Sequence, residues 1–340
     1  MGWFKQQRLG IDLGSATTVI CIENKGIALR EPSIVALNQE TAEIVAFGKE
    51  AEALVGRTSD TYQIVYPIQG SVIVNFSLAQ KMLAHFIKQA LHQAKAKPEV
   101  VLSVPSSISK LERRAVVDML KSLGIHRAMI VEETFVTAIG ADLDIAAPHG
   151  HLVMNIGAGT TDIAIISYGD MIDSITTQAA GNEINRMIID KVREHYHIKI
   201  SNDIAEQLKL TIGNAKYTHH DASDQMKVTG LHVVSSVPED KTIHARIIAE
   251  AISEVIRHIV FATKRLLSEA PPEIAADIAE GGIILAGGTA LLKRIAERLH
   301  DEIGIPVHIV QSPLDCVAIG AVKMLKEMDS KSKLIEKKSR

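Results

Sequence analysis

The sequence is poor in the residues that mark several classes of protein. Its 340 residues include two cysteines and one tryptophan, and aromatic residues make up only 4% of the chain. The two cysteines, Cys21 and Cys316, both lie in apolar segments and do not indicate a disulfide framework. The chain also lacks a signal-peptide pattern and an apolar run of about 18 residues, the usual minimum for a membrane-spanning helix. These absences predict a cytoplasmic protein without structural disulfides.

An excess of positive charge is also missing. Lysine and arginine number 37 against 40 aspartates and glutamates, and the net charge of -3 is spread over interspersed signs. Nucleic-acid-binding domains usually carry a basic face, so neither DNA nor RNA is an expected partner. The chain is 46% hydrophobic and 23% charged, an ordinary composition for a folded protein. It is long enough for two domains with their own cores.

Short apolar runs typical of strands alternate with helical patterns, which indicates an α/β architecture. Residues 77–97 place apolar side chains on one face of a helix, with Ser77 as the expected N-cap. The pattern then predicts a strand over 98–105, a helix over 109–124 and a strand over 126–133. A helix rich in small residues, able to pack closely on a neighbour, is expected from residue 134 onward.

One turn occurs twice in the chain. Residues 9–22 read "LGIDLGSATTVICI" and residues 152–166 read "LVMNIGAGTTDIAII". The alignment matches Asp12 with Asn155, Gly14 with Gly157, Thr17 with Thr160 and Thr18 with Thr161. In each copy a strand, a glycine turn and two threonines bring N–H and hydroxyl donors together, which suits phosphate. Two matched copies predict a phosphate clamp.

Two further features fit a nucleotide. Asp12, at the end of the first strand, could hold a hydrated Mg²⁺, because magnesium prefers oxygen ligands and keeps most of its waters. Residues 281–292, "GGIILAGGTALL", predict a strand that runs into Gly287 and Gly288 and then into a helix. This arrangement lets a backbone approach a ligand and directs a helix N-terminus toward phosphate. Close packing is the alternative explanation for these glycines.

Several segments carry a family resemblance. "GIDLGSATT", "NIGAGTTD" and "ILAGGTALL" resemble the first phosphate, second phosphate and adenosine motifs of the actin, sugar-kinase and DnaK-type chaperone superfamily. "VEETFVTAIGADL" and "LDCVAIGAVKML" resemble its two hinge helices. Within the superfamily the chain is similar to the MreB family of bacterial actins over roughly residues 8 to 326. The resemblance implies an actin-like fold, with two duplicated ribonuclease-H-like domains around a nucleotide cleft and a smaller subdomain inserted in each.

The resemblance also implies boundaries. It places subdomain IA at 1–31 and 66–141, IB at 32–65, IIA at 142–180 and 242–328, and IIB at 181–241, with a disordered basic tail at 329–340.

The same resemblance implies ATP or ADP with Mg²⁺ as cofactors and assigns residues to them. Asp12 would bind the metal through water, and Glu206 and Lys209 would contact the ribose, although a solvent ion pair is the alternative for these two. Glu133 and Thr160 would position the attacking water, with Asn155 as the third catalytic candidate. The remaining nucleotide contacts would be Gly14, Ser15, Ala16, Thr17, Gly157, Ala158, Gly159, Thr160, Thr161, Gly287 and Gly288.

Departures from the family pattern are concentrated at acidic positions. Asn155 and Asn182 stand where aspartate is usual, Ala158 replaces a glycine, and Thr134 replaces a proline. An asparagine still accepts hydrogen bonds but takes no proton from a water. We therefore expect nucleotide binding to survive better than hydrolysis, and any ATPase activity to be slow.

The expected partners follow from the resemblance and from the N-terminus. The family implies self-assembly into paired antiparallel protofilaments under the cytoplasmic membrane, together with the cell-elongation machinery. Trp3 and Phe4 lie beside basic residues and suit the inner face of an anionic membrane, although they could instead cover an edge of the sheet. Residues 91–98 form a short basic loop where some relatives carry a membrane-inserting apolar pair.

Three functions stay open on the sequence. The first is a filament-forming bacterial actin with slow ATPase activity that organises cell-wall synthesis and cell shape. The second is an ATPase-impaired paralogue that acts as a filament partner or regulator. A small-molecule kinase is more remote, because no sugar-recognition segment is found.

Overall fold

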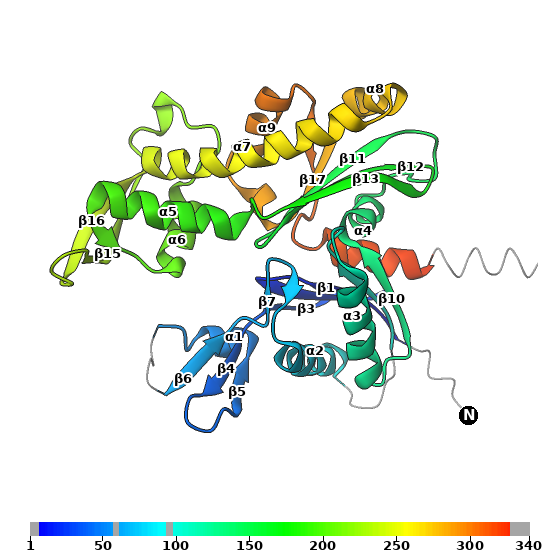
Figure 1. The fold of residues 1–340 in the computed structure, drawn as a ribbon, viewed down its shortest axis with the longest axis horizontal. Helices are drawn as coiled ribbons and strands as arrows, with labels where there is room; N and C mark the ends of the chain where they lie inside the picture. Colours follow the sequence, from blue (N-terminus) through cyan, green and yellow to red (C-terminus); the bar gives the residue numbers. More distant parts are fainter. Residues whose placement is uncertain (1–6, 57–60, 93–97, 327–340) are drawn as a thin grey trace, which may run out of the picture. The chain divides into compact units, whose positions relative to one another are not determined.

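The computed structural model describes residues 7–56, 61–92 and 98–326, and they form two compact units. The first unit spans Met1–Ala147 and Leu314–Arg340, and the second spans Pro148–Pro313. Figure 1 shows the helices and strands of both units. Each unit is built on its own five-stranded sheet.

The sheet of the first unit has the strand order β10-β9-β1-β2-β3. Its strands are β1 (Arg8–Leu13), β2 (Thr17–Ile22), β3 (Gly26–Pro32), β9 (Glu99–Val104) and β10 (Arg127–Glu132). Strand β1 is antiparallel to β2 and parallel to β9. Side chains alternate between the two faces, so Val100 and Leu102 join one core cluster while Val101 joins another.

The sheet of the second unit repeats this plan with the order β13-β12-β11-β17-β18. Its strands are β11 (His151–Ile156), β12 (Thr161–Ser167), β13 (Asp170–Thr177), β17 (Ile283–Ala286) and β18 (Val307–Ile309). Strand β11 is antiparallel to β12 and parallel to β17, as β1 is to β2 and β9. The turn that occurs twice in the sequence is therefore part of a larger repeat, in which the topology of the whole sheet is repeated.

Helices cover both faces of the first sheet. Helices α2 (Phe76–Leu91) and α3 (Lys110–Ser122) share a core cluster with β1, β2 and β9 on one face. On the other face, α4 (Glu133–Gly140) packs with the helical residues 316–326. The N-cap of α2 is Asn75, whose side chain accepts a hydrogen bond from the Leu78 N–H, so the expectation of Ser77 as the cap was wrong.

The predicted close packing of small residues is present between α4 and residues 316–326. A Cβ on Gly320 would lie 1.7 Å from the Val136 carbonyl oxygen, and one on Gly140 would lie 2.2 Å from the Cys316 carbonyl oxygen. No side chain fits at either contact. These two helices therefore cross at backbone distance.

A smaller sheet is inserted after the third strand of each large sheet. In the first unit it contains β4 (Val35–Asn38), β5 (Ile44–Phe47) and β6 (Tyr62–Val65), with α1 (Gly48–Glu52) beside it. A short hairpin follows, formed by β7 (Ile68–Gln69) and β8 (Val72–Ile73). In the second unit the small sheet contains β14 (Ile198–Lys199), β15 (Gln225–His232) and β16 (Pro238–His244).

The remaining elements of the second unit are mostly helical. They are α5 (Gly181–Tyr196), α6 (Asn202–Ile212), η1 (His219–Asp221), α7 (Ala245–Glu269), α8 (Pro272–Gly281), η2 (Gly288–Leu291) and α9 (Ile295–Ile303). Helices α5, α6 and α7 share one core cluster with β11 and β12. The large sheet and the inserted segment are thus held by a common core.

The division into four subdomains stays a prediction. Residues 314–326 group with the first unit, whereas the boundaries expected from the sequence put 242–328 in subdomain IIA. Trp3, Phe4, residues 93–97 of the basic loop and the tail from 327 onward lie outside the described residues. Within the described part of the chain, no helix is long and apolar enough to cross a membrane.

Candidate functional site

The first repeated turn joins β1 to β2 at one edge of the sheet. The Gly14 N–H donates to the Thr17 carbonyl at 3.2 Å and closes the turn. The Ser15 hydroxyl accepts a hydrogen bond from the Ser71 N–H at 2.9 Å, which attaches the β7–β8 hairpin to the turn. Ala16, which lies between Ser15 and Thr17 in the turn, is exposed. The structure therefore brings Gly14 to Thr17 together in one small loop.

Asp12 precedes this turn and has an unusual carboxyl group. Burial of the carboxyl raises its pKa to about 7, with a smaller contribution from the negative charge of Asp315. The Ser103 hydroxyl, 3.4 Å from Oδ1, acts in the opposite direction. A nearby cation would favour the ionised form of such a carboxyl. Asp12 therefore fits the hydrated Mg²⁺ expected from the sequence.

Glu133 lies at the same edge of the first sheet. Strands β1, β9 and β10 are parallel. The register pairs Ser103 of β9 with Val131 of β10, and the Ser103 hydroxyl lies 3.4 Å from Asp12 Oδ1. Glu133 follows two residues after Val131 and begins α4. The next residue, Thr134, is completely buried, and its hydroxyl lies 3.2 Å from the Ser106 hydroxyl. Thr134 thus links the start of α4 to Ser106 through a polar contact.

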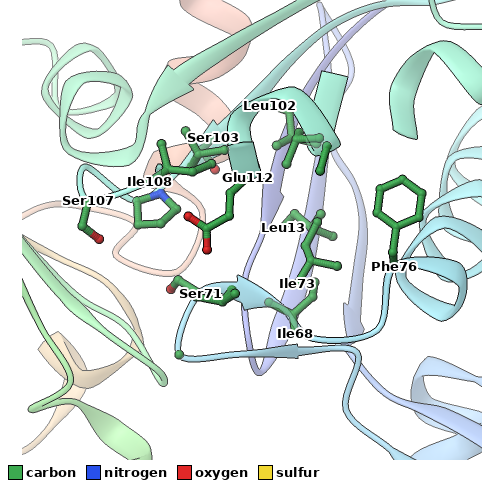
Figure 2. Close-up of a pocket in the computed structure, with 16 residues that line it drawn as sticks. Leu13, Ile68, Ser71, Ile73, Phe76, Leu102, Ser103, Ser107, Ile108 and Glu112 are labelled. Carbon is green, nitrogen blue, oxygen red and sulfur yellow. The ribbon is translucent and has the colours of Figure 1, made fainter. Parts of the chain in front are cut away.

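A pocket of about 180 Å³ lies beside the first turn, and the sequence did not predict it. Figure 2 shows the Glu112 carboxylate among the serine side chains of this pocket, with apolar side chains such as Phe76 on the other side. The pocket is lined by Leu13, which ends β1 just before the turn, and by Ser71, whose N–H bonds to Ser15 of the turn. The pocket is thus directly adjacent to the turn.

The second repeated turn joins β11 to β12 and has the same backbone closure. The Gly157 N–H donates to the Thr160 carbonyl at 2.9 Å, matching the bond between Gly14 and Thr17. The Thr161 hydroxyl donates to the Ala179 carbonyl at 2.6 Å, so this side chain stabilises the fold around the turn. Gly157, Ala158 and Gly159 keep partly exposed surface. Their backbone is the part of this loop that a ligand can reach.

Asp162 is a polar residue of this loop that the sequence analysis did not select. It is 1% exposed and accepts hydrogen bonds from the Thr160 hydroxyl at 3.0 Å and the Thr176 hydroxyl at 2.7 Å. Its cross-strand partner in β11 is Asn155. The signal was present in the last letter of "NIGAGTTD", but its partner Thr176 lies on the next strand, and only the register brings the two together.

Gly287 packs directly against the second loop. Its backbone has φ 91° and ψ 163°, a conformation that is almost restricted to glycine. A Cβ at this position would lie 2.3 Å from the Ile156 carbonyl oxygen and 2.6 Å from Asn155 Oδ1. Asn155, only 3% exposed, therefore turns its amide oxygen toward Gly287. Close packing against the second loop explains why residue 287 is a glycine. The next residue, Gly288, is exposed.

The segment after Gly287 differs from the expected helix. Residues Gly288–Leu291 form a 3₁₀ turn, and the α-helix α9 begins only at Ile295. The Thr289 hydroxyl donates to the Gly157 carbonyl at 2.9 Å, which ties the turn to the second loop. The helix N-terminus expected directly after Gly288 is therefore a short turn that braces the loop.

Helix α5 also begins against the second loop. The Gly181 N–H donates to the Gly157 carbonyl at 3.1 Å, and the Asn182 N–H donates to the Ala158 carbonyl at 2.8 Å. These first N–H groups of the helix bond to the loop backbone. The carbonyls of Gly157 and Ala158 are thus both bonded to the start of α5.

Glu206 and Lys209 are linked to the start of α5. Lys209 is 8% exposed and donates to Glu206 Oε2 at 2.7 Å and to the Gly181 carbonyl at 3.2 Å. Asn185 donates to the same Glu206 oxygen at 2.7 Å. Burial lowers the pKa of Lys209, and the charge of Glu206 opposes this shift. Because Lys209 is buried, the two residues do not form an ion pair in solvent. The Glu206 side chain remains partly exposed.

Comparisons with known proteins show which family the chain belongs to. The family model for the MreB/Mbl protein matches residues 6–333. The cell shape-determining protein Mbl of Bacillus subtilis is 36% identical over 323 residues, covering 94% of this chain and 96% of Mbl. The chain belongs to the MreB/Mbl family.

Solved structures agree on the fold. A crystal structure of MreB5 from Spiroplasma citri bound to AMPPNP has a TM-score of 0.91 and 32% identity, covering 98% of this chain and 99% of that one. The same protein bound to ADP has a TM-score of 0.90 over 96% of this chain and 98% of that one. A MamK double helical filament, 20% identical with a TM-score of 0.81, covers 95% of this chain and 99% of that one. The actin-like fold predicted from the motifs is confirmed.

The packing of Gly287 gives a first prediction. Gly287→Ala is expected to lower the free energy of unfolding by at least about 2 kcal/mol, because of the backbone conformation and the overlap with Ile156. Gly281→Ala is the matched control, since a Cβ there meets nothing within 4 Å. Denaturant unfolding measures both. Equal stabilities of the two variants would contradict the close approach.

The carboxyl of Asp12 gives a second prediction, for protein without nucleotide or metal. Its folded pKa of about 7 exceeds the ordinary aspartate value of 3.8, so between these two pH values the folded protein holds a proton that the unfolded chain has released. Asp12 therefore lowers the free energy of unfolding as the pH rises between these two values. The loss reaches a few kcal/mol at most once the pH is above 7. Asp12→Asn should be more stable than wild type at pH 8, and the difference should vanish near pH 4.

Thermal unfolding across this pH range tests the prediction for Asp12. Replacement of the exposed Asp170 by asparagine serves as the control and should show no such trend. A stability difference for Asp12→Asn that is independent of pH would show that the carboxyl is not buried in the way described.

Proposed function

We propose that this member of the MreB/Mbl family binds ATP through its two repeated loops. The observation that supports the proposal most is the shared closure of the two turns, Gly14 N–H to Thr17 and Gly157 N–H to Thr160, at matching places in two sheets. Backbone N–H groups in such turns form concave sites for phosphate. The MreB5 structures bound to AMPPNP and ADP support the same ligand class.

Other residues then have defined roles toward the nucleotide. The exposed backbone around Gly288 would contact the adenosine, and the carboxylate of Glu206 would accept from the ribose hydroxyls. Lys209 and Asn185 hold that carboxylate in place. Asp12 would hold Mg²⁺ through water, and the ion, when bound, would neutralise phosphate charge. No group of three or more His, Cys, Asp and Glu side chains in the described residues could cage a metal directly.

Hydrolysis would be slow for a chemical reason. Glu133 and Thr160 can orient a water, but Asn155 cannot take its proton and turns its amide oxygen toward Gly287. Loss of such general-base or electrostatic help typically costs on the order of 10² to 10⁴ in rate. The site would therefore hold ATP longer than a site with an aspartate at residue 155.

The biological role that we propose is that of the family. The chain would assemble into paired antiparallel protofilaments in the cytoplasm, at the inner face of the cell membrane, and would act in cell shape with the cell-elongation machinery. Membership of the family and the similarity to a cell shape-determining protein of B. subtilis support this role. Trp3 and Phe4 would supply the membrane contact, since they lie beside Lys5 and Arg8.

A second function is favoured by one specific observation. Asn155 replaces an acid of the family pattern at the second loop, so the chain would act as a filament partner or regulator that holds ATP with little turnover. The two functions differ in measured phosphate release and in self-assembly.

Electron microscopy of the purified protein with ATP and magnesium tests self-assembly. We expect filaments that depend on nucleotide, because the family membership extends over nearly the whole chain. Anionic vesicles should increase the filament number, and the double variant Trp3→Ala, Phe4→Ala should lose vesicle binding while it keeps assembly in solution. Monomers alone at every concentration, with and without vesicles, would contradict the filament proposal.

Asn155→Asp tests the proposal of slow hydrolysis. Phosphate release should rise at least about tenfold, with little change in ATP affinity, because the variant restores a negative charge near the water and metal. Asn182→Asp adds the same charge on the exposed start of α5 and should leave the rate unchanged.

The outcome that contradicts this proposal is specific. A wild-type protein that already hydrolyses ATP as fast as Asn155→Asp would show that the amide is a full substitute for the acid. An equal gain from Asn182→Asp would show that the effect is one of general charge and not of position.

A further inference from the structure

The exposed face of helix α7 carries an aromatic side chain among basic residues. Phe261 is 72% exposed, the largest value for any phenylalanine or tyrosine of the described residues. One helical turn before and after it lie Arg257, His258, Lys264 and Arg265, all of them exposed. Residues three or four apart lie on the same face of a helix, so these side chains flank the ring. An exposed aromatic ring beside an arginine is a combination typical of protein interfaces.

Two of these cations have no ion-pair partner. Within the described part of the chain, every lysine and arginine of residues 148–313 forms an ion pair, except Lys199, Arg257 and Lys264. Arg265 is paired with Glu269 at 3.3 Å. Two of the three unpaired cations of the second unit therefore lie beside its most exposed aromatic ring.

The hairpin that joins β12 to β13 carries the opposite charge. Its tip is formed by Tyr168 and Gly169, whose φ angles of 54° and 78° suit a two-residue hairpin turn. Tyr168 is 71% exposed, although asparagine, aspartate or glycine is the usual residue in such a turn. Asp170 and Asp173 follow on β13 and are exposed, and neither forms an ion pair among the described residues.

A β-bulge turns an apolar side chain outward beside these acids. The pairing of β12 with β13 shifts between Ile165 and Ile166, and Ile172 is the residue that the register leaves without a cross-strand partner. Bulges change the direction of the side chains that they contain. Ile172 is 44% exposed. The hairpin therefore presents Tyr168 and Ile172 together with two carboxyl groups.

The two surfaces are complementary, and they do not meet within one chain. Each has an exposed aromatic ring, one beside unpaired cations and the other beside acidic residues, and opposite charges favour association of such surfaces. Among the described residues, Arg257, Lys264 and Asp170 form no ion pair, as they would if the hairpin reached α7 of its own chain. The lysine-rich residues 331–340 have the same sign of charge as the α7 surface and would be repelled by it.

We propose that the β12–β13 hairpin of one copy of this chain docks on the α7 surface of a second copy. Tyr168 and Ile172 would pack against Phe261, while the hairpin acids would lie opposite Arg257 and Lys264. The contact joins different surfaces of two identical chains, a type of contact that can repeat along an assembly. The proposal rests on the self-assembly proposed above and names one contact of it.

Lys264→Glu tests the contact in the full chain with ATP and magnesium. It places a carboxylate opposite the hairpin acids, so the lowest concentration at which the protein pellets should rise at least about fivefold. Phe261→Ala should cause a similar rise, because it removes the aromatic anchor. Lys199→Glu is the matched control. Lys199 is also exposed and unpaired but lies on β14, so its reversal should change that concentration by less than about twofold.

A charge exchange tests whether the two surfaces are partners. Asp170→Lys alone should weaken assembly as Lys264→Glu does, because it brings like charges together. The chain with both changes should assemble within about threefold of the wild-type concentration, since opposite charges face each other again.

Cross-linking gives an independent measurement of the same contact. A chain with Phe261→Cys, mixed with a chain with Tyr168→Cys, should give a covalent dimer with a short bis-maleimide reagent. A chain with Lys199→Cys in place of Phe261→Cys should not. The native Cys21 and Cys316 are buried and should not compete for the reagent.

Three results would overturn the proposal. Equal effects of Lys264→Glu and Lys199→Glu would show that only net charge matters. A charge exchange that restores no assembly would show that the surfaces are not partners. A Lys264→Glu variant that assembles normally but loses binding to vesicles containing phosphatidylglycerol would show that the α7 surface faces lipid.

Failure of this contact and failure of the proposed function give different results. A wild-type protein that never assembles would refute the proposed self-assembly and this contact with it. A wild-type protein that assembles, with no change in any α7 or hairpin variant, would overturn the contact alone. Thermal unfolding checks that each variant folds. If Asp170→Lys does not fold, Asp173→Lys replaces it in the charge exchange, with the same expected recovery.

Discussion

The geometry of the candidate site depends on one interaction, the backbone hydrogen bond that closes the glycine turn between two antiparallel strands. In each unit it runs from a glycine N–H to the carbonyl of the first threonine, Gly14 to Thr17 and Gly157 to Thr160. Because the bond fixes where the second strand starts, it fixes the register of every cross-strand pair beyond it. Asp12 then faces Val19, and Asn155 faces Asp162. The identity of the polar groups at the sheet edge follows from this closure.

The rest of the second unit's site is attached to the same turn. Thr289 and the start of α5 both bond to the carbonyl of Gly157, and Lys209 bonds to the carbonyl of Gly181 at that start. Glu206 is in turn held by Lys209. A change in the turn would therefore move η2, α5 and α6 together. Elements that are distant in sequence behave as one support for the loop.

Sequence patterns predicted the elements of the fold well where apolar periodicity is strong. The strand over 98–105 and the helix over 109–124 correspond to β9 and α3. The choice between similar residues was less predictable. Asparagine and serine are both common capping residues, but Asn75 caps α2 because the Asn75 side chain is the one that reaches the Leu78 N–H. The hydrogen bonds of Asp162 and the lining of the pocket beside the first turn depend on neighbours from other strands and helices. No single stretch of sequence contains both partners of those contacts.

The neutral residue at 155 also has a structural reason. Asn155 lies in register with the buried carboxylate of Asp162 and presses its amide oxygen against Gly287. Two carboxylates directly opposed on one face of a sheet repel each other, and the repulsion is stronger where both are buried. An aspartate at 155 needs a cation nearby to be stable as an anion, whereas an asparagine is stable with or without one. The pair of Asn155 and Asp162 therefore places only one acidic group at this point of the sheet, and two threonine hydroxyls donate hydrogen bonds to that group.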